Sequence, residues 1–262
     1  MNYHKIIYGN NIEIMKKMEE ESINLVVTSP PYPGNDKWGP LYNESNVKEA
    51  HRYLSLVWNE CIRLLKPGCK LIINIGNLKR RPYLPNTYCI YSSLVDKIEP
   101  LGEFIWDKGY PWGGITAWGS YRLPSDPSTR EQHEYILVFR KFGKRDRPKI
   151  YKKIDKSDFL SWINSIWKIA PGKASKIHHI APFPIEIPRR LITLYSFENE
   201  IILDPFLGSA STQIASEQLE RNSIGIEISK DYCELAYNRM KKEVDQLKLN
   251  REQKSKIEKI NF

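Results

Sequence analysis

The chain has few cysteines, and their spacing builds no metal site. No two of the four form a Cys-x-x-Cys pair, and no histidine spacing completes a zinc site, so we expect no metal. Reduced and mostly buried thiols are the default in a cytosolic protein. The cysteines are Cys61, Cys69, Cys89 and Cys233.

Long hydrophobic runs are also missing. No apolar run approaches the ~20 residues that a transmembrane helix needs. The N-terminus lacks the apolar segment of a secretory signal. These absences predict a cytoplasmic protein without a membrane partner.

Acidic residues are fewer than basic ones. The chain has 31 Asp and Glu against 40 Lys and Arg, for a net charge of +9 over 262 residues. This excess favours a polyanionic partner, although a generally basic proteome would produce it too. The length fits one α/β domain with a modest embellishment, or two small domains.

Predicted strands alternate with predicted helices along most of the chain. Strands are expected at 4–8, 23–27, 70–75, 102–106, 134–140, 200–203 and 223–228, and helices at 11–20, 48–65, 88–98, 185–196, 212–220 and 230–248. This alternation predicts an α/β fold with a mostly parallel sheet and helices on both faces. Residues 33–47, 107–132 and 141–180 lie outside the pattern, and such long irregular segments are often functional.

The pentapeptide Thr28-Ser29-Pro30-Pro31-Tyr32 follows the apolar run 23–27. The prolines stop the strand because they donate no ladder hydrogen bonds. The turn therefore lies at the carboxyl edge of the sheet, where open α/β folds bind ligands. Its hydroxyl, free carbonyls and aromatic ring suit a planar base that carries an exocyclic amino group. The alternative is a simple turn that caps a strand.

A second motif follows the strand predicted at 200–203. Asp204-Pro205-Phe206-Leu207-Gly208-Ser209-Ala210-Ser211-Thr212 is a turn of mostly small residues before a helix, and Glu227 comes at the end of the next strand. Small residues let a ligand approach the backbone closely, and an acid at a strand end can accept both hydroxyls of a ribose. This half of the chain suits a nucleoside cofactor.

Together, in this order and spacing, the two motifs resemble the β class of amino-group DNA methyltransferases, which use S-adenosylmethionine. The resemblance covers nearly the whole chain. It implies a Rossmann-like sheet with one antiparallel edge strand, at 134–140. It also implies a catalytic half at 1–140, a small target-recognition region at 141–180, a cofactor-binding half at 181–248 and a charged tail at 249–262.

The catalytic residues that the resemblance implies are those of the first motif. The Ser29 hydroxyl and the Pro30 carbonyl would accept the N–H bonds of the target amine, Pro31 would fix the turn, and Tyr32 would stack on a base flipped out of the duplex. The chain has no Pro-Cys dipeptide, which the cytosine-C5 methyltransferases use to place their nucleophile. A covalent cysteine mechanism is therefore not expected.

The resemblance also implies a cofactor site. Asp204 would serve the methionine moiety, Phe206 would pack near the adenosine, and Glu227 would bind the ribose. Ala210 and Ser211 stand where the family usually has a glycine and a threonine. The predicted cofactor-binding residues are Asn10, Asn11, Thr28, Phe183, Pro184, Asp204, Pro205, Phe206, Gly208, Ser209, Thr212, Glu227 and Ile228.

Contacts to double-stranded DNA are expected from two segments. Trp118 and Tyr121, in a stretch rich in aromatics and glycine, are candidates for the second wall around a flipped base. The stretch 141–156 has eight basic and two acidic residues and would contact phosphates, although most charge runs are solvated faces. The other predicted DNA-binding residues are Arg122, Arg130, Lys144, Arg145, Arg147, Lys149, Lys152 and Lys153.

The resemblance leaves more than one function open. Serine at position 29 goes mainly with N4-methylation of cytosine, and aspartate or asparagine there with N6-methylation of adenine. An RNA or protein-amide methyltransferase, and an inactive DNA-binding homologue, are the remaining alternatives. The family further implies protection of host DNA beside a cognate restriction endonuclease, by a monomer or a homodimer.

Overall fold

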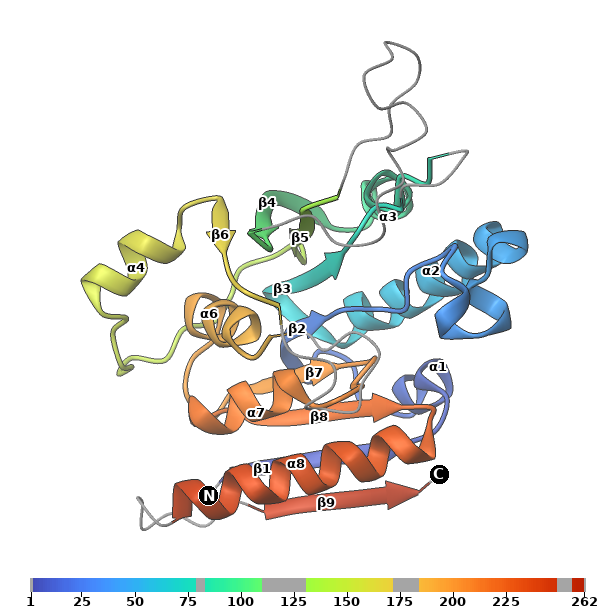
Figure 1. Cartoon of the computed structure of the whole chain (residues 1–262). Helices are drawn as coiled ribbons and strands as arrows, with labels where there is room; N and C mark the ends of the chain where they lie inside the picture. The colour runs from blue at the N-terminus through green and yellow to red at the C-terminus, as the bar shows by residue number, and fades with distance from the viewer. Residues whose placement is uncertain (1, 79–82, 110–130, 172–183, 249–255, 262) are drawn as a thin grey trace.

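Strand β2 (Ile23–Thr28) lies in the middle of a sheet, and all six of its residues are buried. The computed structural model describes residues 2–78, 83–109, 131–171, 184–248 and 256–261. In these, nine strands pair in the order β6-β4-β5-β3-β2-β7-β8-β1-β9 (Figure 1). The others are β1 Tyr3–Tyr8, β3 Leu65–Ile75, β4 Glu99–Asp107, β5 His133–Arg140, β6 Ile166–Lys168, β7 Ile201–Asp204, β8 Asn222–Glu227 and β9 Lys256–Asn261.

Helices cover both faces of the sheet (Figure 1). One layer holds α1 (Asn11–Lys16), α2 (Val47–Leu64) and α3 (Asn86–Leu94), and the other holds α6 (Glu186–Tyr195), α7 (Ser211–Gln218) and α8 (Lys230–Lys248). A short helix, α4 (Lys156–Trp162), precedes β6. Three short 3-10 helices, Asp36–Trp38, Pro40–Tyr42 and Glu44–Asn46, lie between β2 and α2.

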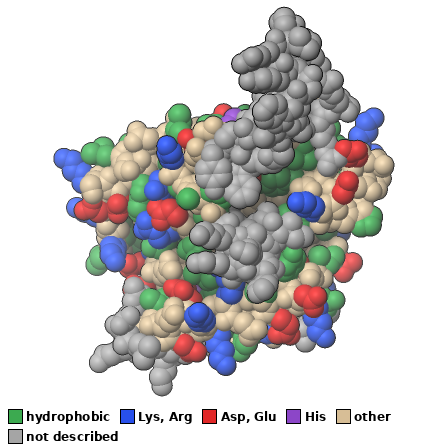
Figure 2. Space-filling model, in the orientation of Figure 1, with side chains coloured by type: hydrophobic (Ala, Val, Ile, Leu, Met, Phe, Trp, Pro, Cys, Tyr) green, Lys and Arg blue, Asp and Glu red, His purple; other side chains and the backbone are tan. Residues whose placement is uncertain are grey.

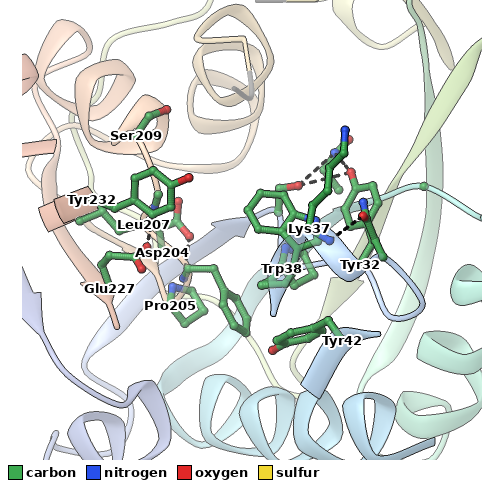
Figure 3. Close-up of a pocket in the computed structure, with 18 of the residues that line it drawn as sticks. Tyr32, Lys37, Trp38, Tyr42, Asp204, Pro205, Leu207, Ser209, Glu227 and Tyr232 are labelled. Carbon is green, nitrogen blue, oxygen red and sulfur yellow. Dashed lines mark hydrogen bonds between the residues drawn. The ribbon is translucent and has the colours of Figure 1, made fainter. Parts of the chain in front are cut away.

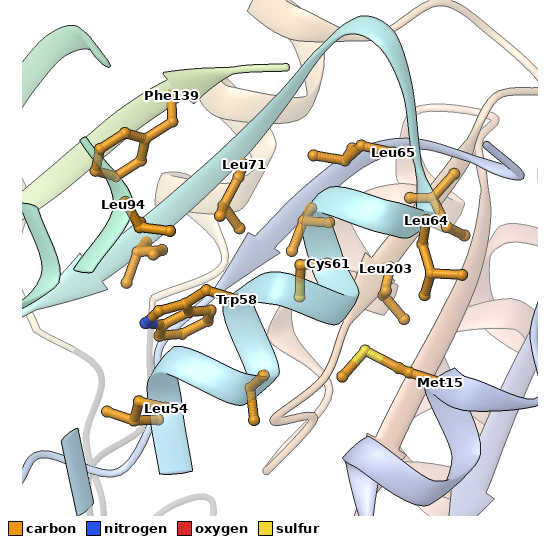
Figure 4. Close-up of a cluster of buried hydrophobic side chains, with 14 of the residues drawn as sticks. Met15, Leu54, Trp58, Cys61, Leu64, Leu65, Leu71, Leu94, Phe139 and Leu203 are labelled. Atoms are coloured by element: carbon orange, nitrogen blue, oxygen red, sulfur yellow. The ribbon is translucent and has the colours of Figure 1, made fainter. Parts of the chain in front are cut away.

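Helix α2 shows how the pattern of apolar residues builds the core. Its buried residues recur every three or four positions, which places them on one face of the helix. The fully buried Trp58 lies in the core with Leu71 and Leu203 of the central strands and Phe139 of β5 (Figure 4). A second core under α6 and a third under α7 and α8 lie on the opposite face. The sheet is thus held rigid from both sides.

The prediction of a mostly parallel Rossmann-like sheet is confirmed, but one detail of it is wrong. The antiparallel strand β5 does not lie at the edge, because it pairs with β3 on one side and with β4 on the other. Residues Ile136, Leu137 and Phe139 are fully buried, as expected for an internal strand. Strand β6, only three residues long, forms that edge of the described sheet.

The C-terminal segment also differs from the prediction. The expected charged tail contains β9, whose residues pair in parallel with β1 along its whole length. Ile257 packs against the core under α8, and Ile260 packs against the α2 core. The region at 141–180 contributes α4 and β6 to the same fold.

Three of the four described cysteines are buried, and all four are unpaired. No described helix is long and apolar enough to span a membrane.

A buried polar cluster joins the amino ends of β1 and β8 to α7, away from the carboxyl edge of the sheet. His4 Nδ1 lies 2.7 Å from the Ser223 hydroxyl, and His4 Nε2 lies 2.7 Å from a Glu217 carboxylate oxygen. His4 and Ser223 are fully buried and Glu217 nearly so. Each polar atom therefore finds its partner inside the protein, as burial requires.

Candidate active site

The two predicted motifs meet at the carboxyl ends of adjacent parallel strands. Strand β2 pairs with β7, so the turn at 29–32 and the turn at 205–210 leave the sheet side by side. Between them lies a cavity of about 780 Å³. Figure 3 shows Asp204 and Glu227 on one side of this cavity and Tyr32 on the other. Its size is that of a small-molecule site.

A hydrogen bond joins the ends of β2 and β7 on the side of the cavity that Asp204 lines. The Thr28 hydroxyl donates to Asp204 Oδ1 at 2.7 Å, and the Phe206 amide donates to the same oxygen at 3.1 Å. Burial raises the pKa of Asp204 to about 6, against the opposing effect of its hydrogen bonds from Thr28 and Thr212. A buried carboxylate of this kind favours a cation beside it, because a positive charge stabilises the ionised form.

Glu227 is oriented by the backbone around it. Its two carboxylate oxygens accept the amides of Gly208 at 2.9 Å and Ser229 at 2.8 Å. Burial raises the pKa of Glu227. Gly208 has φ +48°, which a glycine adopts without strain. A carboxylate has about four acceptor sites and the backbone amides do not fill them all, so the side chain can still accept a hydrogen bond from a diol in the cavity.

Asn10 and Asn11 attach the first turn to this site. Asn10 Oδ1 caps α1 by accepting the amides of Ile12 and Glu13. Asn11 Nδ2 donates to the Pro205 carbonyl at 3.0 Å, and its Oδ1 accepts the Tyr53 hydroxyl at 2.6 Å. Both line the cavity. The side-chain oxygen of Asn10, one of the predicted cofactor-binding residues, is therefore already used as a helix cap.

The turn at 29–32 carries a connected hydrogen-bond network. The Tyr32 hydroxyl donates to Glu134 Oε2 at 2.7 Å and lies 3.5 Å from the Ser29 hydroxyl. Asn74 Nδ2 lies within hydrogen-bond distance of all three, at 2.7 Å from Glu134, 3.1 Å from Tyr32 and 3.3 Å from Ser29. Lys108 Nζ contacts the second Glu134 oxygen at 2.5 Å. Ser29 is thus linked to a carboxylate that the sequence did not indicate.

The conformation of Tyr32 depends on Gly76. A Cβ atom at position 76 would lie 3.0 Å from the Tyr32 ring and 3.4 Å from Glu134 Cγ. The ring can pack closely there only because glycine has no side chain. Burial, followed by the negative charge of Glu134, raises the pKa of Tyr32 well above its usual range. The hydroxyl therefore keeps its proton and acts as a donor.

Most of the predicted site residues that the structure describes line this one cavity. They are Asn10, Asn11, Ser29, Pro30, Pro31, Tyr32, Asp204, Pro205, Phe206, Gly208, Ser209, Thr212, Glu227 and Ile228. Thr28 is fully buried behind the cavity and acts on Asp204 instead. Pro184 precedes α6 and is not a lining residue. Phe183, Trp118, Tyr121, Arg122 and Arg130 lie outside the described residues.

The predicted basic stretch begins at the edge of the sheet opposite the cavity. Gly68, before the paired part of β3, donates to the Lys141 carbonyl, so the chain after β5 runs along the amino edge of the sheet. Lys144 and Arg147 line a second hollow there, beside Asn24 and Glu200 at the starts of β2 and β7. Strand β2 is six residues long, which separates the two edges by ~20 Å.

Arg145 is a clear correction to the predicted phosphate contacts. Its guanidinium pairs with Glu200 at 2.5 Å, donates to the Tyr195 carbonyl at 2.7 Å and lies 4.8 Å from the Phe197 ring centre. Only 13% of the Arg145 side chain is exposed. A guanidinium held in this way joins the segment to the sheet and is not available to a phosphate. Lys149, Lys152 and Lys153 are exposed in the connection that leads to α4.

Several cavity residues were not predicted. Asn74 comes near the end of β3, and Glu134 and Lys108 lie where β5 begins and β4 ends. Because β5 is antiparallel, its first residues reach the same edge as the last residues of its neighbours. An antiparallel strand predicted at 134–140 could therefore have indicated that Glu134 lies at the carboxyl edge. Trp38, Tyr42, Tyr53 and Tyr232 line the cavity from loops and helices whose approach was not predictable.

Comparison with known proteins is decisive for the family. A model described as DNA methylase matches residues 23–238. The chain belongs to this DNA methylase family. The resemblance to the amino-group DNA methyltransferases is thereby confirmed.

Its relatives match along most of their length. Type II methyltransferase M.MthZI of Methanothermobacter thermautotrophicus is 32% identical, over 95% of this chain and 79% of that protein. Type II methyltransferase M.MjaI of Methanocaldococcus jannaschii is 34% identical, over 87% and 88%. A DNA modification methylase from Thermus thermophilus, solved in complex with S-adenosyl-L-methionine, has a TM-score of 0.77 at 28% identity, covering 97% of this chain and 99% of that one.

Proposed function

We propose that this DNA methylase transfers a methyl group from S-adenosylmethionine to the exocyclic N4 of cytosine in double-stranded DNA. The observation that carries the proposal is a single cavity lined by Ser29 and Pro30 and also by the acids Asp204 and Glu227, with Tyr32 across the cavity from the two acids. The family supports DNA as the substrate. The proposal includes protection of host DNA beside a cognate restriction endonuclease.

The residues of the cofactor side fit the proposed cofactor. S-adenosylmethionine is a nucleoside with a sulfonium ion, and it would supply an electrophilic methyl group. Asp204 is buried and Glu227 is half-buried, both carboxyls have raised pKa values, and a bound cation would favour their charged forms. The backbone amides on Glu227 orient its carboxylate toward a diol. The solved Thermus relative contains the same cofactor.

On the catalytic side, the chain positions an amine that is a poor nucleophile. Its nitrogen lone pair is delocalised into the base, so it must be held in line with the methyl donor. The Ser29 hydroxyl and the Pro30 carbonyl accept its two N–H bonds, which favours a more tetrahedral nitrogen. Such positioning contributes up to ~7–11 kcal/mol in the best cases. The base reaches this depth only after leaving the duplex, at a cost of a few kcal/mol.

Serine at position 29 favours cytosine N4 over adenine N6. A hydroxyl accepts an amine hydrogen and passes one on, and here it lies beside Tyr32 and Asn74. In the family, aspartate or asparagine accompanies the adenine reaction. N6-methylation of adenine is the second candidate, because its chemistry and geometry would be the same.

The DNA backbone must lie along the carboxyl edge if a base is to enter the cavity. Lys37, which is exposed on the first 3-10 helix, lines the cavity there and is our candidate phosphate contact. Among the described residues, Figure 2 shows acidic and basic side chains intermixed over the face seen in Figure 1, with no continuous basic patch. Contacts at the cavity mouth therefore matter more than the overall charge.

The test of this function is a Ser29→Ala variant. Its affinity for S-adenosylmethionine should stay within about twofold of the wild-type value, because the Ser29 hydroxyl contacts Tyr32 and Asn74 rather than Asp204 or Glu227. Its rate of methyl incorporation into DNA should fall by a factor of ~10² or more, because the amine loses an acceptor. Full activity with unchanged cofactor affinity would remove Ser29 from the mechanism.

A further inference from the structure

The carboxylate of Glu134 lies beside the catalytic turn, although it belongs to neither motif. Strand β5 brings it to the carboxyl edge, where one oxygen accepts Tyr32 Oη and Asn74 Nδ2, each at 2.7 Å. The other oxygen pairs with Lys108. Only 12% of the side chain is exposed, yet Glu134 lines the cavity. The charge of Glu134 is therefore balanced by Lys108, and both of its oxygens have hydrogen-bond partners.

Methylation of an exocyclic amine requires a proton acceptor. The nitrogen gains a carbon and carries a positive charge until it loses a proton. That cation is a strong acid, because loss of the proton lets the lone pair return to the ring. Ser29 and Tyr32 can relay a proton but are not bases at neutral pH, and burial with the nearby Glu134 charge raises the pKa of Tyr32 further.

Two other acids of the described cavity, Asp204 and Glu227, are poorly placed for this task. They lie on the opposite side of the cavity from Tyr32, and their oxygens accept hydrogen bonds from Thr28, Phe206, Gly208 and Ser229. Glu131 and His133 also line the cavity, but it is Glu134 that accepts the Tyr32 hydroxyl. Lys108, as an ammonium ion, accepts nothing. Asn74 cannot accept the proton either, because the atom that faces Glu134 is its donor nitrogen, Nδ2. The opposite orientation of the amide would place its oxygen against the Glu134 carboxylate, where the two would repel. Glu134 is thus the carboxylate that hydrogen-bonds both Tyr32 and Asn74, and these two residues contact Ser29.

We propose that Glu134 receives the proton released by the target amine, through the hydroxyls of Ser29 and Tyr32. This inference rests on the proposed function, since it concerns the same reaction. Glu134 acts through other residues, so it is a positioning and proton-accepting residue and does not contact the base. Its partner Lys108 supplies the counter-charge that a buried carboxylate needs.

The step balances in atoms and charge. The amine lone pair forms the new N–C bond, and the S–C bond breaks with its electron pair left on sulfur. The N–H bonding pair returns to nitrogen as the proton passes to Ser29 Oγ. Ser29 gives its own proton to Tyr32 Oη, and Tyr32 gives its proton to Glu134 Oε2. A sulfonium and a carboxylate thus become a thioether and a carboxylic acid, and Glu134 later returns the proton to water in the cavity.

The relay contains one long contact, the 3.5 Å between Ser29 Oγ and Tyr32 Oη. Catalytic hydrogen bonds of this kind are often long without substrate and shorten in the reactive complex. The Tyr32–Glu134 bond is short already. The final transfer is therefore preorganised, and the first is completed when the base enters.

The test compares Glu134→Gln with the wild-type protein in two measurements. Calorimetry should give the same S-adenosylmethionine affinity within about twofold, which shows that the variant is folded. Single-turnover methylation of unmodified plasmid DNA should slow by ~10² or more, because a glutamine keeps the shape but accepts no proton. Tyr32→Phe should slow the same step without changing the cofactor affinity.

A small-molecule rescue separates a proton acceptor from a structural support. Glu134→Ala leaves a gap that formate or formamide can enter, and the two have nearly the same shape. Formate should restore the single-turnover rate at least tenfold and formamide should not. Equal rescue by both, or a wild-type rate in Glu134→Gln, would overturn the proposal. Failure of the wild-type protein to methylate any base would instead refute the proposed function, and this inference with it.

Discussion

The Thr28 hydroxyl and the Asp204 carboxylate meet at 2.7 Å across the ends of strands β2 and β7. This bond joins the last residue of β2, just before the turn at 29–32, to the last residue of β7, just before the turn at 205–210. Both atoms are buried, so the bond forms away from water. The relative position of the two halves of the site therefore depends on it, and so does the charge of Asp204.

We predict that Thr28→Val weakens S-adenosylmethionine binding roughly tenfold. The change keeps the shape of the side chain but removes a hydrogen bond to a charged group, which contributes ~1.5–3 kcal/mol. Calorimetry at pH 7.5 measures the effect. Thr193→Val is the matched control, because the Thr193 hydroxyl bonds only its own helix, at Arg189. Equal affinity in both variants would show that the Thr28–Asp204 bond is not needed for binding.

Cofactor affinity should depend on pH near the pKa of Asp204. Burial raises this pKa to about 6, so the carboxyl is mostly ionised at pH 7.5 and mostly protonated at pH 5. A cationic ligand prefers the ionised form, so affinity should fall by up to about tenfold per pH unit below 6. Asp204→Asn should bind weakly at both pH values, with a shallower dependence. A wild-type affinity that rises on acidification would contradict the assignment.

DNA binding should depend on the carboxyl edge of the sheet. Lys37→Ala should reduce the slope of log affinity against log salt by ~0.9, the value of one phosphate contact. Lys149→Ala removes the same charge from the segment that leaves the amino edge, and it should leave the slope unchanged. Fluorescence anisotropy with a labelled duplex gives both slopes. The reverse pattern would restore the predicted role of the basic stretch.

Arg145 should prove to be a stability residue. Arg145→Ala leaves the half-buried Glu200 without its ion-pair partner and should lower the free energy of unfolding by up to ~3–5 kcal/mol. Urea denaturation measures the loss, and Lys144→Ala, an exposed neighbour, should change stability by less than ~0.5 kcal/mol. If Arg145→Ala were as stable as Lys144→Ala, the Arg145–Glu200 ion pair would not hold the segment to the sheet.

The sequence predicted the two turns because each follows a strand with an unambiguous pattern. All six residues of β2 are buried, and two prolines end it. Buried parallel strands of this kind are short apolar runs, and their carboxyl ends must meet at one edge. The spacing of Asp204 and Glu227 followed from the same logic. These features are local, so local reasoning found them.

What the sequence did not predict depends on contacts distant in the chain. Strand β6 has three residues, and nothing in Ile166–Lys168 distinguishes it from a loop until it pairs with β4. Strand β9 follows a charged helix and is stabilised by its pairing with β1. Charge alone could not show that Arg145 faces Glu200 rather than solvent. The role of Glu134 depends on the antiparallel direction of β5, which brings it to Tyr32.

The central claim is tested most directly by identifying the methylated base. The protein is incubated with unmodified DNA and methyl-labelled S-adenosylmethionine, the DNA is digested to nucleosides, and the labelled product is identified by mass. We predict N4-methylcytosine. Labelled N6-methyladenine would contradict the inference from Ser29 while leaving the mechanism in place, and DNA without label would contradict the proposed function itself.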